Sequence, residues 1–348
     1  MLFKDLKSRM LLPDDEIIIN KHIKIKDKDC IVLGFCSQGA ENKLWMIVHD
    51  EKACYRDNSE DLDFTCDEEM ILSNRGQMKQ RIDDSIHFSI NEIEIQGKKI
   101  NFCSSTAYCL SDNGYEPYMM LQHFAQKGLL LDEFDEYNVY ELFIYSFNQQ
   151  ENEEFPKPDL SRELDIKLHV SYNPKEILSQ KYISLDFGDD INEKYIFYDE
   201  EDKKECVFYI NKLIHYDIWE DANKHFDSED MKNAVKASGI NNEELEVMKK
   251  DYFDFVEQSC PKGMDLAMIE YETEDDIQLN FYTREFLDAK PEYKNKSGIF
   301  LFSPDIKTGP HGFRNRMTML KTVKKDFNEK MDFELFSWYK KIPDEIIE

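Results

Sequence analysis

Basic side chains gathered near residue 310 are the first candidates for chemistry in this sequence. The segment 307–325 contains no Asp or Glu, and its basic residues are Lys307, Arg314, Arg316, Lys321, Lys324 and Lys325, with His311 among them. Residues 309–312 read Gly-Pro-His-Gly, which predicts a turn. On a strand after this turn, Arg314 and Arg316 share one face and can bind a carboxylate or a phosphate. The candidate residues for binding an anion or a partner are therefore Lys307, His311, Arg314, Arg316 and Lys321.

The chain also contains an acidic segment that can neutralise this basic stretch. Residues 265–288 include eight acidic residues, and Arg284 is the basic residue among them. If the two segments form neighbouring strands, opposite charges pair across the sheet. We favour this internal pairing over binding of an acidic or phosphorylated partner, and we favour both over a catalytic anion site.

Two further groups of residues suggest catalysis or metal binding. His49 and Asp50 follow an apolar strand, and imidazole and carboxylate both suit a divalent cation. The strand context favours a surface pair instead. Cys103 would be a nucleophile if His87 or His123 lay beside it, but we prefer to interpret it as a buried structural thiol.

Acidic runs are frequent in this chain, so each of them is only a weak indicator of a functional site. Asp189–Asp190, Asp199–Asp202 and Asp275–Asp276 could hold Ca²⁺ or form an acid/base pair. Adjacent carboxylates on a strand point to opposite faces, so we interpret these runs as solvated turns. Asp186-Phe187-Gly188 matches the metal-binding triplet of protein kinases, but the glycine-rich loop and the H-R-D motif are absent. We interpret the triplet as a chance match, and we predict neither a metal nor a cofactor.

The common catalytic motifs are missing from the sequence. It has no G-x-G-x-x-G, no P-loop, no G-x-S-x-G and no H-E-x-x-H, and its eight cysteines include no C-x-x-C pair. Familiar nucleotide-binding folds, serine hydrolases, zinc proteases and thioredoxin-like redox sites are therefore disfavoured. The cysteines are expected to be mostly buried thiols.

The charge of the chain limits its partners. The 348 residues include 72 acidic and 44 basic ones, a net charge of −28. This charge repels phosphate backbones and anionic lipids, so general nucleic-acid binding is disfavoured. We find neither a signal-peptide pattern nor an apolar run long enough to span a bilayer. The sequence therefore predicts a cytoplasmic protein that is not membrane-embedded.

The patterns in the first half predict short strands and one helix. Strands are expected at 17–25, 30–36, 44–49, in a hairpin at 92–103, and in an apolar segment at 139–147 that fits either a helix or a strand. Pro117 opens a helical pattern that Gly128 can end.

The second half predicts more strands around a pair of helices. Leu164 to Val170 alternate with polar residues, which should leave His169 facing water. Helices are expected after Ser228 and after Asn241, the second with a capping box and an apolar stripe of Leu245, Met248, Tyr252, Phe255 and Val256. Further strands are expected at 182–187, 194–198, 206–210, 266–272, 277–282, 298–302, 313–320 and 333–339.

Strands, then a helical pair, then strands indicate an α+β protein with mainly antiparallel sheets and a few packed helices. The segment 149–159, with Pro156 and Pro158, is the candidate linker. We therefore expect two α+β domains, 1–150 and 151–348, with the helical pair near 229–258 in the second. Charges on the two sides of residue 150 sum to −11 and −17, so neither half is a dedicated polyanion-binding module.

The function that these observations favour is binding of another protein, in the manner of an inhibitor, immunity or adaptor protein. Aromatic residues, 13% of the chain, suit interfaces, and an acidic surface suits a basic partner. Two alternatives stay open. One is a hydrolase whose site is built from dispersed carboxylates, His49 or the Arg314 and Arg316 pair, and the other is a structural or assembly component.

Overall fold

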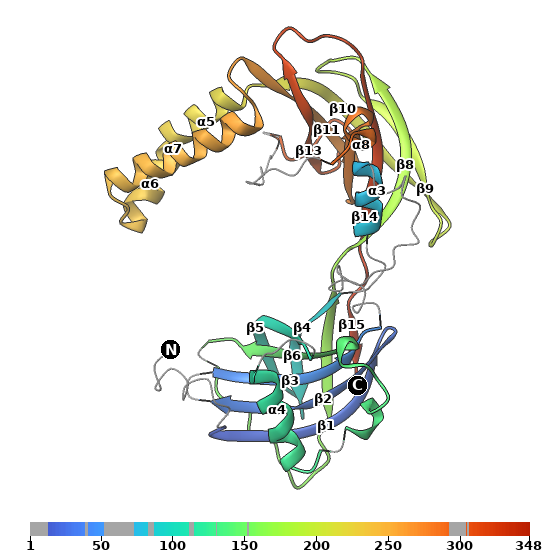
Figure 1. The fold of residues 1–348 in the computed structure, drawn as a ribbon, viewed down its shortest axis with the longest axis vertical. Coiled ribbons are helices and arrows are strands. Elements are labelled where there is room, and N and C mark those ends of the chain that lie inside the picture. Colours follow the sequence, from blue (N-terminus) through green and yellow to red (C-terminus); the bar gives the residue numbers. More distant parts are fainter. Residues whose placement is uncertain are drawn as a thin grey trace. The chain divides into compact units, whose positions relative to one another are not determined.

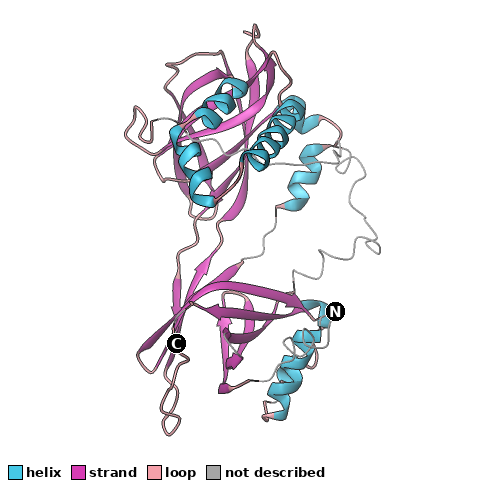
Figure 2. Ribbon diagram, turned by 90° about the vertical axis from the view of Figure 1, so that its left-hand side faces the viewer, coloured by secondary structure: helices cyan, strands magenta, loops and turns pink. Residues whose placement is uncertain are grey.

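The computed structural model describes residues 13–38, 41–51, 73–82, 87–110, 115–129, 131–151, 153–291, 304 and 306–348. In this part of the chain there are six α-helices and 15 strands, and the strand pairs with a described register are antiparallel (Figure 1). Strands make up most of the regular structure (Figure 2). The predicted α+β class with mainly antiparallel sheets is confirmed. None of the described helices has the length and apolar content needed to cross a membrane.

The chain forms two compact units by its internal contacts. Unit 1 comprises Met1–Phe64, Asp84–Lys175 and Lys341–Glu348, and unit 2 comprises Thr65–Asp83 and Glu176–Lys340. The contacts thus divide the chain at residues 175 and 176. A domain boundary at residue 150 stays a prediction.

Unit 1 contains a sheet of eight strands in the order β1-β2-β3-β6-β5-β4-β7-β15. Their bounds are β1 Asp15–Ile25, β2 Lys28–Gln38, β3 Glu41–His49, β4 Phe88–Ile95, β5 Lys98–Cys109, β6 Leu142–Gln149, β7 Ile166–Tyr172 and β15 Glu345–Ile347. The predicted hairpin is confirmed as β4 and β5. It turns at Gln96 and Gly97, whose φ angles are 50° and 80°, as a tight two-residue hairpin requires.

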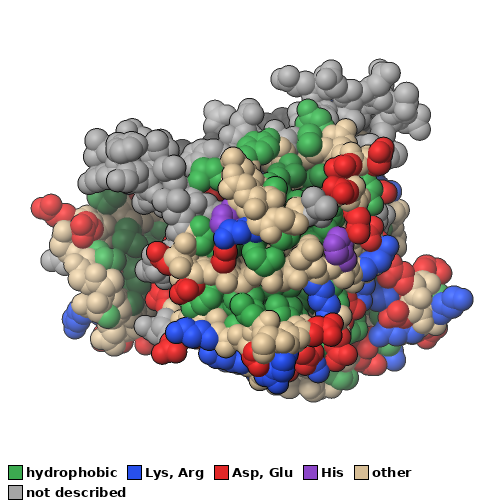
Figure 3. All heavy atoms as spheres, turned by 90° about the horizontal axis from the view of Figure 1, so that it is seen from below, with side chains coloured by type: hydrophobic (Ala, Val, Ile, Leu, Met, Phe, Trp, Pro, Cys, Tyr) green, Lys and Arg blue, Asp and Glu red, His purple; other side chains and the backbone are tan. Residues whose placement is uncertain are grey.

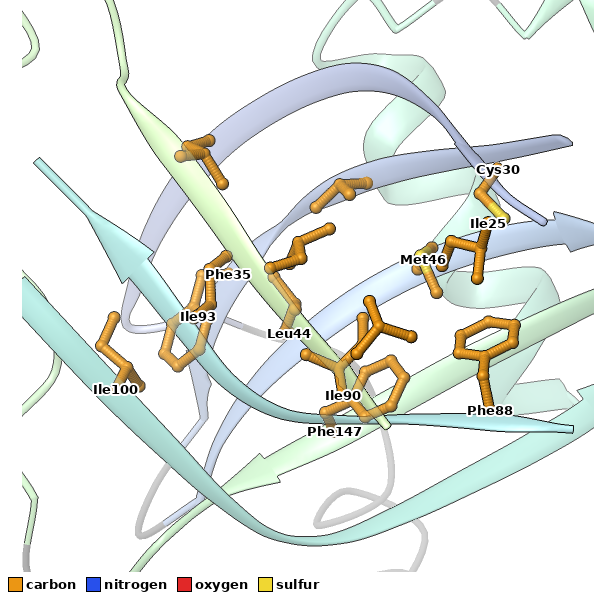
Figure 4. Packing of buried hydrophobic residues seen from close by; sticks show 14 of the residues in the cluster. Ile25, Cys30, Phe35, Leu44, Met46, Phe88, Ile90, Ile93, Ile100 and Phe147 are labelled. Carbon is orange, nitrogen blue, oxygen red and sulfur yellow. The ribbon is translucent and has the colours of Figure 1, made fainter. Parts of the chain in front are cut away.

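Apolar residues cover both faces of this sheet. Residues from β1 to β7, among them Phe35, Ile93 and Phe147, form the larger cluster (Figure 4). The other face is covered by α4 (Tyr115–Gln126), which contributes Met120 and Phe124. This helix includes the predicted Pro117. Two short 3₁₀ helices, Asp132–Phe134 and Val139–Glu141, lie between α4 and β6.

Unit 2 is built on two sheets, β13-β11-β10-β9 and β12-β14-β8. Their bounds are β8 Lys175–Leu185, β9 Glu193–Asp199, β10 Lys204–Tyr216, β11 Met264–Thr273, β12 Gln278–Thr283, β13 Asn315–Lys324 and β14 Met331–Lys340. Phe208 and Tyr271 of the first sheet and Phe281, Phe333 and Trp338 of the second belong to one buried cluster. The strand expected at 298–302 lies outside the described residues.

Helices α5 (Ile218–Asp227) and α7 (Asn242–Ser259) cover the opposite side of the four-stranded sheet, where Ile218 and Val256 pack on Leu266 and Met268 of β11. Helix α6 (Glu229–Ser238) lies between them in the chain and buries no residue. The predicted helical pair is α6 and α7, with the capping box of Asn241 and Glu244 in place. Two more helices, α3 (Asn74–Arg81) and α8 (Arg284–Asp288), are joined by the ion pair of Arg75 with Asp288, and Arg75 also pairs with Glu334 of β14.

Candidate functional site

Strand β13 of the basic stretch 307–325 lies beside β11, the first part of the acidic segment 265–288, in one sheet. Strand β13 pairs with β11, with Arg316 opposite Tyr271 and Lys321 opposite Ala267. Arg316 Nη2 lies 2.6 Å from Asp276 Oδ1. Lys321 Nζ lies 2.8 Å from Glu285 Oε2. Two of the candidate residues are therefore neutralised by the segment 265–288.

Lys325, at the end of the same stretch, is also paired. Its Nζ lies 2.6 Å from Asp217 Oδ2 and 3.6 Å from Asp265 Oδ1. Asp217 precedes α5 and accepts hydrogen bonds from the backbone N–H of Trp219 and of Glu220, each at 3.0 Å. Lys325 thus links the end of β13 to the start of the helices.

The predicted turn before β13 closes over a buried carboxylate. Gly312 N donates to Gly309 O at 3.1 Å, and Gly309 N donates to Phe313 O at 3.0 Å. Glu272 is fully buried and accepts hydrogen bonds from His311 N (3.2 Å) and Phe313 N (2.8 Å). A Cβ at Gly309 would lie 2.1 Å from Glu272 Oε1, so only glycine fits there. The turn is built around this carboxylate.

Glu272 belongs to a buried polar cluster that sequence reasoning missed. Asn211 Nδ2 donates to Glu272 Oε1 at 2.8 Å, and Asn315 Nδ2 donates to Glu270 Oε2 at 3.1 Å. Lys212 Nζ lies 3.1 Å from Glu270 Oε2. A register shift in the pairing of β10 with β11 lies between Ile210 and Lys212, as in a β-bulge. A bulge leaves no periodic signal in the sequence.

The other candidate residues have different surroundings. The His311 ring stacks on Tyr209 with ring centroids 3.9 Å apart. Within the described residues, no carboxylate lies at ion-pair distance from Arg314 or Lys307. Because a strand rises about 3.3 Å per residue, Arg316 and Lys321 lie about 16 Å apart along β13. One small anion could not contact both, whereas a longer partner segment could.

Two open hollows adjoin Lys321 in unit 2. One, of about 380 Å³, is lined by acidic, basic and apolar residues, including Arg284, Asp288 and Lys330. The other, of about 600 Å³, includes Thr322, Lys324 and Phe327. Charges of both signs line the smaller hollow, which leaves no single ligand charge favoured there.

His49 and Asp50 do not form the expected surface pair. His49 is only 6% exposed, and its ring stacks on Tyr137 with centroids 3.6 Å apart. Its Nε2 lies 3.4 Å from Glu141 Oε2, while the Asp50 carboxylate pairs with Lys28. The surface interpretation is therefore wrong for His49, because β3 ends under the segment that precedes β6. In the described part of the chain, no three His, Cys, Asp or Glu residues are grouped as a metal site would require.

The cysteines agree only partly with the expectation of buried thiols. Cys30, Cys36, Cys206 and Cys260 are buried, and burial raises the pKa of Cys30 and Cys36 to about 12 and that of Cys206 and Cys260 to about 11. Cys103, however, is exposed, and the buried interpretation is wrong for it. Its Sγ lies 3.6 Å from the carbonyl oxygens of Asn148 and Gln149. His123 is hydrogen-bonded to Glu16 at 2.7 Å.

The acidic run 199–202 is more than a solvated turn. Asp199 is 1% exposed, and Lys340 Nζ lies within 3.2 Å of carboxylate oxygens of Asp199, Glu201 and Asp202. Burial alone would lower the pKa of Lys340, but Asp202 and Asp199 outweigh it and raise that pKa. A lysine ammonium thus occupies the position that a cation would take.

Helices α5, α6 and α7 extend from the sheet of unit 2 and form what we call the helical arm, residues 218–259 (Figure 1). Its base is packed: the rings of Trp219 and Phe253 stack with centroids 5.7 Å apart, and Val256 is fully buried. Its distal part is open, since α6 has no buried residue, and Val247 and Met248 are 59% and 47% exposed. Met248, a member of the predicted apolar stripe of α7, is therefore exposed, whereas Val256 of the same stripe is buried.

Comparison with known proteins gives no relative for this chain. No family model, no curated protein and no solved structure matches it. Its function therefore has to be argued from its own surfaces. One face of the molecule shows hydrophobic side chains exposed among acidic and basic ones (Figure 3).

Proposed function

We propose that this protein binds another protein and that the distal part of the helical arm is its docking element. The observation that carries this proposal is the exposure of Val247 and Met248 on a helix pair whose α6 buries no residue. A helix of ten residues is marginal in water unless packing supports it. Such an apolar, unsupported helix end suits insertion into an apolar groove of a partner.

The ends of α6 are encoded by the sequence itself. Ser228 accepts a hydrogen bond from Met231 N at 3.1 Å, and Gly239 ends the helix with φ 70°. These caps stabilise α6 although none of its residues is buried against another element. A partner would therefore meet a preformed surface, which lowers the entropy cost of binding.

The charge of the arm indicates the chemistry of the partner. Residues 218–259 contain 11 acidic and 5 basic side chains. A partner groove with an apolar floor and a basic rim complements this surface and would associate faster at low salt. A second arm of the same charge would be repelled. A cytoplasmic location belongs to this proposal. So does the lack of general nucleic-acid binding, which the net charge of −28 supports.

The test compares two pairs of substitutions in the same unit. Immobilised wild-type chain is exposed to extract of the source cells, a protein that it retains is purified, and this protein is offered to the variant Val247→Glu/Met248→Glu. The matched control is Ile196→Glu/Tyr198→Glu on β9, where the two side chains are 40% and 50% exposed.

The purified pair is then measured by calorimetry at low and moderate salt. We expect the arm variant to weaken binding at least about tenfold, because it places charge in an apolar contact. The control should bind like wild type, and added salt should raise the dissociation constant. Equal affinities of the arm variant and the control would refute the proposal that the distal part of the arm is the docking element.

A further inference from the structure

The second half of β5 in unit 1 is a strand that the rest of the described chain covers poorly. Five consecutive residues, 103–107, are exposed on both faces of the sheet. Strand β4 pairs with β5 only over Lys98–Asn101, and β6 pairs with it over Phe102–Cys109. Within the described residues, 103–107 is therefore paired along one edge only.

The direction of the backbone groups follows from one hydrogen bond. Leu110 N donates to Leu142 O at 2.8 Å, so Leu110 faces β6. Because backbone groups alternate along an antiparallel strand, Tyr108, Thr106 and Ser104 also face β6. Ser105 and Ala107 consequently direct their N–H and C=O groups to the open edge. Such unpaired groups are a template for another strand.

This edge lacks the usual protection against pairing. The run 100–111 contains no charged residue and no proline, although charged residues make up 33% of the chain. Edge strands are normally protected by lysines, prolines or bulges. The register shift in β5 lies between Phe102 and Ser104, so the segment after it stays regular. The side chains of Ser104 to Ala107 are small and allow a close approach.

We propose that this edge binds the same edge of a second copy of the chain. The two β5 strands run antiparallel across a two-fold axis at Thr106, so that Ser105 of each copy lies opposite Ala107 of the other. In this register, the outward-facing Ser105 and Ala107 of one copy form hydrogen-bonded pairs with Ala107 and Ser105 of the other. An identical strand thus matches each open donor with an acceptor, as an isologous interface requires.

The local absence of charge allows a second copy to approach this edge. Two chains of net charge −28 repel each other over most of their surfaces. The segment 100–111 carries no charge, so pairing there places no like charges directly opposite each other. Salt screens the remaining repulsion, so dimerisation should strengthen as ionic strength rises.

The same register places two cysteines opposite each other. Cys103 of one copy, at the register shift of β5, comes across from Cys109 of the other, and neither is in a disulfide within the chain. Their Sγ atoms lie 3.6 Å from Asn148 O and Tyr140 O of their own chain, so both side chains must rotate to form a link. Residues opposite each other in a hydrogen-bonded pair have Cα atoms about 5.5 Å apart. Disulfides form across about 4.4–6.8 Å. The arrangement therefore predicts a specific intermolecular cross-link.

The first experiment is sedimentation equilibrium of the full chain over a wide range of concentration. Ala107→Pro removes an N–H that faces the open edge, and proline is tolerated at such a position. We expect a wild-type dimer and a dissociation constant at least about tenfold higher for Ala107→Pro, since each copy loses a hydrogen bond. Ser105→Ala keeps every backbone donor and should dimerise like wild type. The thermal midpoints of both variants check that they fold.

The second experiment uses diamide as the oxidant. Two thiols, one from each copy, lose two protons and two electrons, which diamide takes up as it becomes a hydrazine, and one S–S bond forms. Mass spectrometry should identify a Cys103–Cys109 link between copies, lost in Cys103→Ser and in Cys109→Ser. A chain that stays monomeric, a dimer indifferent to Ala107→Pro, or a Cys103–Cys103 link would overturn the proposal.

Discussion

The basic stretch 307–325 and the helical arm belong to the same compact unit, but the chain pairs three of the basic side chains of the first and leaves the apolar end of the second exposed. Arg316, Lys321 and Lys325 all have carboxylate partners from the chain itself. Val247 and Met248 remain exposed at the end of the arm. The excess of basic residues in 307–325 therefore reflects how unit 2 is assembled. The unpacked end of the helical arm, in contrast, is a surface that is available to a partner.

The largest effect that would sharpen this comparison is expected at the turn of the basic stretch. Glu272→Ala leaves the donors of Asn211, His311 and Phe313 unsatisfied, and we expect a loss of about 2–4 kcal/mol in the free energy of unfolding. The measurement is urea denaturation. The exposed neighbour Glu274→Ala should cost less than about 0.5 kcal/mol. Equal losses would show that the turn does not depend on the buried carboxylate.

A smaller effect should separate the base of the arm from its end. Val256 is fully buried, so Val256→Ala should lower the free energy of unfolding by about 1–3 kcal/mol. Val247→Ala removes the same methyl groups from an exposed position and should cost less than about 0.5 kcal/mol. Both values come from denaturant titration of the purified chain. The distinction between base and end fails if Val247→Ala is as destabilising as Val256→Ala.

The smallest effect concerns Asp217, which joins the two regions. The hydrogen bond from Lys325, with that from Glu220 N, lowers the pKa of Asp217. Since the folded pKa lies below the unfolded value of about 3.9, this stability is present above that pH and disappears as the pH falls through the folded pKa. Asp217→Asn should therefore cost about 0.5–1 kcal/mol at neutral pH and less at an acidic pH below about 3.9.

Urea titrations of both chains at the two pH values provide the test. Lys325→Met is the matched control, because it removes the ion pair but keeps the N-cap of α5. It should lose part of the same pH-dependent stability. A cost of Asp217→Asn that does not change with pH would rule out a contribution from the charge.

Local sequence patterns predicted much of the fold. Strand β7 alternates as expected, with Ile166, Leu168 and Val170 buried, because period two is visible in the residues themselves. His169 is half-buried and lies 3.1 Å from Glu92 rather than facing only water. Helix α5 was not predicted, although Asp217 supplies an N-cap and Ile218, Ala222 and Phe226 recur at the four-residue spacing of a helix.

The candidate site was less predictable because it depends on contacts between distant residues. The pairing of Arg316 with Asp276 joins positions 40 residues apart, and only the excess of charge in each segment signalled it. The Glu272 cluster had no such signal, since a buried carboxylate looks like any other acidic residue in a chain with 72 of them. The open edge of β5 was hidden too, because a hairpin prediction does not say how far its strands stay paired.

Strand β15 has a consequence for the order in which the chain can fold. It pairs residues 345–347 with β7, across the whole of the intervening unit 2 segment 176–340. During synthesis unit 2 can fold while unit 1 still lacks this strand, and the long sequence separation makes its closure slow. A nascent chain stalled on the ribosome before β15 is released would therefore expose the edge of β7. Strand β15 covers this edge of unit 1 only at the end of folding.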